Sequence, residues 1–171
     1  MRQSAVYAIF AGMGRLRFYF EWLVHFLSAN SRHGTHSPFV YQLVDEVVYA
    51  DRRPGEPSDK VERLTTRLID RFQPHTVYKL SGGQHLPSSL DFVIIDGGGH
   101  EKLAAQIEAL WPRLHPRSVL VLSGFHRHDN AKALWRSIKA KPNVTVTIDL
   151  FWVGLVFFHS GQCKEDFKIR F

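Results

Sequence analysis

The chain has 171 residues, 44% of them hydrophobic, which suits one globular domain with a sizeable core. Its formal charge of +6 is spread along the chain, and no Lys/Arg run reaches the roughly five to eight residues of a basic motif, so we expect no nucleic-acid partner. The single cysteine, Cys163, excludes an intramolecular disulfide and fits a reducing, cytoplasmic location.

The N-terminal segment 5–27 is apolar but is interrupted by Arg15, Arg17, Glu21 and His25. A membrane-spanning helix needs about twenty mostly apolar residues, and a signal peptide carries its positive charge before the apolar run. Neither pattern fits, so we expect no membrane span. A peripheral membrane helix stays open as an alternative, because Phe, Trp and Arg side chains mix in this segment.

Three helices are expected in the first part of the chain. The first carries Leu16, Phe20, Leu23 and Leu27 at helical spacing. The second starts at Ser37-Pro38, an N-cap followed by proline at the first helical position. We take residues 1–58 as a helical N-terminal extension and residues 59–171 as the main domain, whose first helix starts at Asp59 and ends before Pro74.

The pattern beyond Pro74 predicts an α/β fold in which an open parallel sheet is covered by helices. The expected strands are 76–80, 90–95 and 118–122, and the expected helices are 101–114 and 130–141. The turn between Leu150 and Gly154 is too short for a parallel crossover, so strands 144–150 and 154–159 must be antiparallel. The alternation of apolar and basic residues over 167–171 predicts a last strand near a sheet edge.

Three loops follow the expected parallel strands and should therefore lie side by side. In an open α/β sheet, ligands bind at this carboxyl end of the strands. The loops are Ser81-Gly82-Gly83-Gln84, Asp96-Gly97-Gly98-Gly99-His100 and Ser123-Gly124-Phe125-His126. Asp96 could bind a ligand or a metal, serve as a base, or simply cap the next helix. His100 and His126 are candidate bases, or else loop histidines in water. We expect no metal site, because no cysteine or carboxylate pair accompanies the histidines.

Three segments resemble a group of bacterial class I S-adenosylmethionine-dependent methyltransferases of the O-methyltransferase type. They are the run from His36 to Tyr41, the run from Phe92 to Gly97 followed by His100, and the C-terminal part, with its segments 144–151, 154–158 and 167–171. The resemblance implies a Rossmann-like sheet of seven strands in the order 3-2-1-4-5-7-6, with the seventh antiparallel. It also implies S-adenosylmethionine as cofactor, held near Ser81, Gly82, Gly83, Asp96 and Gly97, with His100 or His126 as a catalytic base.

The chain departs from this family in the cofactor-binding half. Only residues 81–89 separate the first expected strand from the next, which leaves no room for the family's second and third strands or for the ribose-binding carboxylate. Lys79 stands near the family's acidic position, and Ser123-Gly124 replaces two adjacent carboxylates. The expected fold is therefore a Rossmann-like methyltransferase sheet that lacks the second and third strands, with an antiparallel C-terminal strand and a helical N-terminal extension.

Two functional hypotheses are favoured over a third, a basic nucleic-acid-binding protein, for which no recognition motif appears. The first is a methyltransferase that transfers the methyl group of S-adenosylmethionine to an unknown small-molecule or other acceptor. The second is a non-catalytic methyltransferase descendant that acts as a binding or dimerisation module, in which the N-terminal helices or a second copy of the chain cover the exposed sheet.

Overall fold

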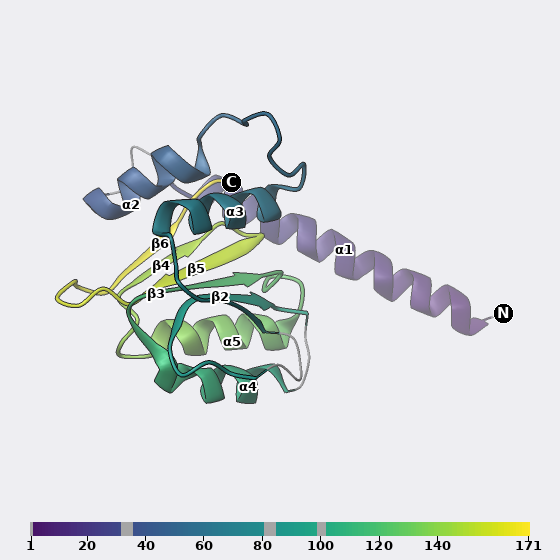
Figure 1. The fold of residues 1–171 in the computed structure, drawn as a ribbon. Helices are drawn as coiled ribbons and strands as arrows, with labels where there is room; N and C mark the ends of the chain where they lie inside the picture. Colours follow the sequence, from purple (N-terminus) through teal and green to yellow (C-terminus); the bar gives the residue numbers. More distant parts are fainter. Residues whose placement is uncertain (1, 32–35, 81–84, 99–101) are drawn as a thin grey trace.

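The computed structural model describes residues 2–31, 36–80, 85–98 and 102–171. This part of the chain forms an α/β fold with a six-stranded mixed sheet (Figure 1). The helices are α1 (Arg2–Ser28), α2 (Pro38–Leu43), α3 (Lys60–Phe72), α4 (Leu103–Leu110) and α5 (Asp129–Ala140), with a π-helical turn at Val44–Val48 and a 3₁₀ turn at Trp111–Arg113. The strands are β1 (Val77–Leu80), β2 (Leu90–Asp96), β3 (Leu114–Ser123), β4 (Val146–Asp149), β5 (Val153–Phe157) and β6 (Glu165–Lys168).

The first three strands run parallel and in register. Leu80 lies opposite Ile95, and Ile95 lies opposite Leu122, so the carboxyl ends of β1, β2 and β3 meet at one edge of the sheet. The prediction that these three strands share an edge is therefore confirmed. Most residues of β2, and those of β3 from Ser118 to Leu122, are buried, which accounts for their continuous apolar runs, whereas Val77 and Lys79 of β1 are exposed.

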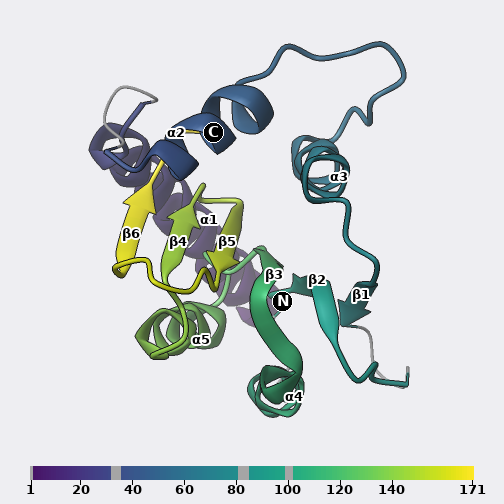
Figure 2. The same ribbon diagram turned by 60° about the vertical axis from the view of Figure 1, so that its left-hand side comes forward.

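The full strand order is β1-β2-β3-β5-β4-β6, as Figure 2 shows from right to left. β5 is antiparallel to both β3 and β4, which confirms the prediction drawn from the short turn between them. β6 pairs parallel with β4 at the edge of the sheet, where the alternating sequence predicts a last strand, but it spans Glu165–Lys168 instead of 167–171. Because β4 and β6 run in the same direction as β1–β3, Asp149 and Lys168 also end at the shared carboxyl edge.

Helices cover both faces of the sheet, so the molecule has two hydrophobic cores. In Figure 1, α2 and α3 lie above the sheet, and α4 and α5 lie below it. Phe92 belongs to the core beneath α2 and α3, whereas its neighbour Val93 belongs to the core over α4 and α5. This alternation follows from the period of two along a strand.

The third strand starts earlier than the sequence predicts. The helix expected to reach Leu114 ends at Leu110, and β3 begins at Leu114 instead of Ser118. Proline explains the change, because Pro112 suits the tight turn and Pro116 pushes the preceding residue, His115, into extended backbone. Ser118 then joins this entry segment to β2, since its hydroxyl donates a hydrogen bond to the Leu90 carbonyl at 2.6 Å.

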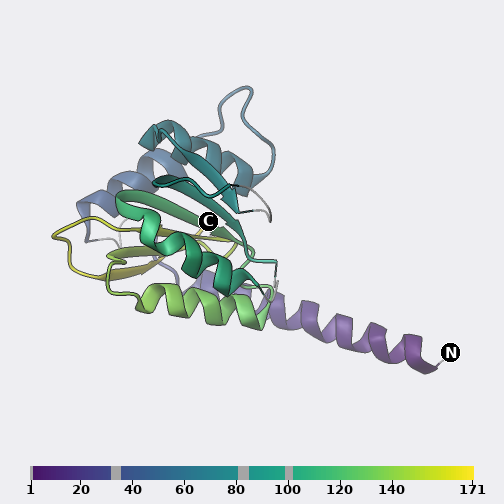
Figure 3. The ribbon, with the colours of Figure 1, turned by 60° about the horizontal axis from the view of Figure 1, so that its bottom comes forward.

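The helix α1 projects from the folded body at its N-terminal end (Figures 1 and 3). Its C-terminal end is fixed to the sheet, because the Asn30 amide donates to the Lys168 carbonyl and the Arg170 amide donates to the Asn30 carbonyl. Within the described ranges, no helix is both long and apolar enough to cross a membrane.

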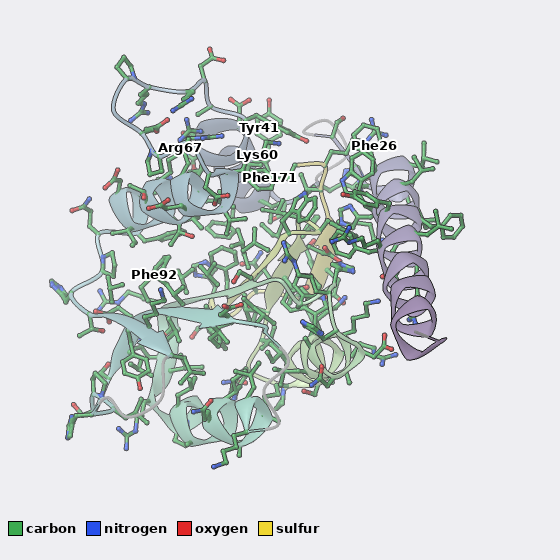
Figure 4. All side chains as sticks on the ribbon, turned by 90° about the vertical axis from the view of Figure 1, so that its right-hand side faces the viewer. Phe26, Tyr41, Lys60, Arg67, Phe92 and Phe171 are labelled. Carbon is green, nitrogen blue, oxygen red and sulfur yellow. The ribbon has the colours of Figure 1, made fainter. Side chains whose placement is uncertain are left out.

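A partly buried ion pair holds the segment between the π-helical turn and α3. The Arg67 guanidinium donates two hydrogen bonds of 2.7 Å to the Glu56 carboxylate and further bonds to the carbonyls of Val47, Ala50 and Asp51. Figure 4 labels Arg67 below this loop. The hydrogen bonds from Arg67 lower the pKa of Glu56 from 4.5 to about 2.

The substitution Glu56→Gln should lower the stability of the fold at neutral pH. A carboxylate whose pKa is depressed on folding stabilises the folded state above its unfolded pKa, and this contribution is lost as pH falls from 4.5 toward about 2. We therefore expect the difference in free energy of unfolding between wild type and variant, measured by urea denaturation, to shrink over that window. Glu62→Gln, at an exposed glutamate, is the control; equal losses in both variants would contradict the assignment.

Candidate functional site

Of the seven residues that the sequence assigns to cofactor binding or catalysis, the structure describes three. Asp96 ends β2 with an exposed side chain, Gly97 follows it, and His126 lies in the loop between β3 and α5. Ser81, Gly82, Gly83 and His100 lie outside the described residues.

Gly97 ties the end of β2 to the end of β3. Its amide donates a hydrogen bond of 2.7 Å to the Ser123 carbonyl. A Cβ atom at this position would lie 2.5 Å from the same carbonyl oxygen, so only glycine fits. Gly124 follows with a φ of +68°, and the space beside it faces Asp96. The glycines thus keep the Asp96 carboxylate close to the β3–α5 loop.

His126 belongs to a cluster of three ionisable side chains at the same edge. Its Nε2 donates to the Asp149 carboxylate at 3.2 Å, and Nε2 of His25 donates to the other oxygen of that carboxylate at 3.0 Å. Asp149 ends β4, whereas His25 comes from α1. The carboxylate therefore joins the N-terminal helix, the β3–α5 loop and the sheet.

Asp149 remains ionised in this cluster. Burial acts to raise its pKa, but hydrogen bonds from His126 and His25, together with their charges, hold the pKa of Asp149 well below its usual value of 3.8. Because an ionised carboxylate only accepts hydrogen bonds, Nε2 of each histidine carries a proton. In a neutral His126, Nδ1 is then the nitrogen that can accept a proton, which is the orientation that a general base requires.

A strained turn holds an aromatic wall beside His126. Phe151 has a φ of +67°, and the Trp152 amide donates to the Leu150 carbonyl across it, which forms a γ-turn between β4 and β5. The Phe151 amide donates to Asp149 at 2.8 Å and stabilises this conformation. The Phe151 ring stacks on the His126 ring, with centroids 4.4 Å apart. Backbone strain of this kind is common at functional sites.

A cavity of about 570 Å³ opens beside the cluster, between α1 and α5. This volume is in the usual range for small-molecule sites, roughly 300–1,000 Å³. Apolar side chains and charged side chains both line it. The apolar ones are Phe20, Val24, Phe125 and Trp135; the charged or titratable ones are Arg17, Glu21, His25, His126, Asp129, Lys132, Arg136 and Lys168.

The charges around this cavity leave an excess of cations. Glu21 pairs with both Arg17 and Lys132, at 3.0 and 2.5 Å, and Asp129 accepts a further bond from Arg17. Arg136 and Lys168 have no carboxylate partner among the ion pairs of the described residues. The cavity therefore favours a ligand with an apolar body and a negative charge.

His25 and Asp149 were missed by the sequence reasoning. In the sequence, His25 stands out only as a polar interruption of the apolar segment 5–27. Asp149 follows an apolar strand, as Asp96 does, so the rule that singled out Asp96 applies to it equally. What the sequence lacks is a signal that α1 packs against the end of β4.

Hydrogen bonds from His25 and His126 to Asp149 hold this cluster together. In the described ranges, no group of three or more His, Cys, Asp or Glu side chains has the arrangement of a metal site.

Comparison with protein-family models, with curated proteins and with solved structures finds no match to this chain. The strand order, the carboxyl edge of the sheet and the cavity are the features of this chain that bear on its function.

The substitution Asp149→Asn should destabilise the fold by about 1–3 kcal/mol at pH 7, because a buried charged acceptor of two histidines and one amide is lost. Since the pKa of Asp149 is depressed on folding, its contribution is complete above pH 3.8 and declines as pH falls below that value. Urea denaturation at pH 7 and at a pH below 3.8 measures the difference in free energy of unfolding between wild type and variant. Asp70→Asn, at an exposed aspartate, is the control; a variant as stable as wild type at pH 7 would refute the role of Asp149.

Proposed function

We propose that the chain is a shortened class I S-adenosylmethionine-dependent methyltransferase, which transfers a methyl group to a small acceptor bound in the α1–α5 cavity. The observation that carries this proposal is the order of five of the six strands, β1-β2-β3-β5-β4, with β5 antiparallel and β6 added beyond β4. The family order 3-2-1-4-5-7-6 becomes this order when its second and third strands are removed.

The described residues at the carboxyl end of β2 fit the cofactor. Asp96 is an exposed carboxylate that can accept hydrogen bonds, and Gly97 keeps the backbone of β2 and β3 close together there. S-adenosylmethionine, when bound, supplies an electrophilic methyl group. The residues of this chain would orient the acceptor and take up its proton.

His126 is the residue best placed to take up that proton. It lines the cavity, its ring is fixed between Phe125 and Phe151, and Asp149 holds Nε2 as a donor so that Nδ1 can accept. An acidic hydroxyl or amine on an apolar, negatively charged acceptor fits both this base and the cationic lining. Positioning would supply most of the rate enhancement.

The edge strand β1 and the connection that follows it favour a second function, that of a non-catalytic binding module. The exposed side chain near the end of β1 is Lys79, a cation where a carboxylate would favour the cofactor. Residues 85–89, the described part of the connection to β2, contain no helix. In this alternative the cavity binds its ligand without methyl transfer.

Isothermal titration calorimetry with S-adenosylmethionine and with S-adenosylhomocysteine separates the two functions. A methyltransferase should bind both, and Asp96→Asn should weaken the affinity about ten- to a hundredfold through the loss of a charged hydrogen bond. Asp70→Asn, on α3 and exposed, should leave it unchanged. Absence of heat at millimolar ligand would reject the methyltransferase and leave the binding module.

A further inference from the structure

The helix α1 packs on the folded body with one face and leaves the opposite face uncovered. Phe18 contacts the rings of Phe151 and Trp152 at 5.1 and 5.4 Å, and His25 is buried against Asp149. Seven large apolar side chains of the helix are 41–73% exposed: Leu16, Tyr19, Phe20, Leu23, Val24, Phe26 and Leu27. Phe20 and Val24 lie at the edge of this set and also line the α1–α5 cavity. We call these seven side chains the α1 apolar face; Figure 4 labels Phe26 among them.

The spacing of this face is that of a coiled coil. Four residues of this face, Leu16, Phe20, Leu23 and Leu27, recur at separations of four and three, and the sequence continues this spacing toward the N-terminus at Val6, Ile9 and Met13. An apolar repeat of this kind over about three heptads is typical of helices that pair with another helix. The helix is about 40 Å long at 1.5 Å per residue, and its N-terminal part projects from the body where a partner can reach it.

We infer that the α1 apolar face pairs with the same face of a second copy of this chain. A two-fold pair places identical surfaces together, which an apolar heptad seam allows without further adaptation. The positions flanking the seam from residue 17 onward are Arg17, Tyr19, Val24 and Phe26, so Arg17 is the one charge among them. Glu21 and Asp129 of the same chain already neutralise it. No repulsion between like charges therefore opposes the pair.

A membrane surface fits this helix less well. Helices that lie in the lipid interface carry Lys and Arg on the face opposite their apolar side chains. In α1 the opposite face carries Phe18 and His25 and is occupied by the folded body. The pairing does not depend on whether the sheet binds a cofactor.

Sedimentation equilibrium over a range of concentrations tests this pairing. Wild type should move from 19.7 kDa toward twice that mass as concentration rises. The double variant Leu16→Glu, Leu23→Glu should remain monomeric, because it places charges in the seam. Tyr41→Glu, at a side chain of α2 that is 42% exposed, should dimerise like wild type. Circular dichroism checks that each variant is folded, and Leu27→Glu gives a second, single-site test.

Three results would overturn the inference. They are a wild-type chain that is monomeric up to its solubility limit, folded seam variants that still dimerise, and an equal loss of dimer in Tyr41→Glu. Sedimentation with vesicles of anionic phospholipid tests the alternative that the α1 apolar face binds a membrane surface. A monomer that binds vesicles through Leu16 and Leu23 would assign the face to a membrane surface and refute self-pairing.

Discussion

The Asp149 carboxylate is the interaction on which the arrangement of the candidate site depends. It sits at the end of β4, accepts hydrogen bonds from His25 and His126, and is itself held by the Phe151 amide. An ionised carboxylate in a buried position is costly unless it is fully hydrogen-bonded, and here donors from three segments satisfy it. Those donors fix α1 against the sheet, and α1 in turn forms one wall of the cavity.

The register of β1–β3 and the reversal at β5 bring this cluster to the ligand edge. Because β4 runs in the same direction as β2, Asp149 and Asp96 end at the same edge, although 53 residues separate them in the chain. The sheet thus offers two carboxylates with different environments. Asp96 is exposed and available to a ligand, whereas Asp149 is committed to orienting histidines. We therefore propose that Asp96 binds the cofactor and that Asp149 orients the histidine that acts on the acceptor.

The sequence predicted the parallel strands, their common edge and the antiparallel end of the sheet, because buried strands leave continuous apolar runs and short turns exclude crossovers. It placed His126 at this edge but not its partners. His25 lies on a helix whose apolar spacing resembles that of a core helix, although Leu16, Phe20, Leu23 and Leu27 are exposed. Periodicity reports that a face is apolar and does not report what covers it, so the docking of α1 through Phe18 and His25 could not be read from the pattern.

The most direct test of this account is a long-range ¹H–¹⁵N spectrum of the histidine side chains in wild type and Asp149→Asn. We predict that the imidazole signals of both His25 and His126 shift in the variant, while those of His115, which pairs with Asp91 on another part of the sheet, do not. A spectrum in which only one of the two histidines responds, or neither does, would show that Asp149 does not join α1 to the β3–α5 loop.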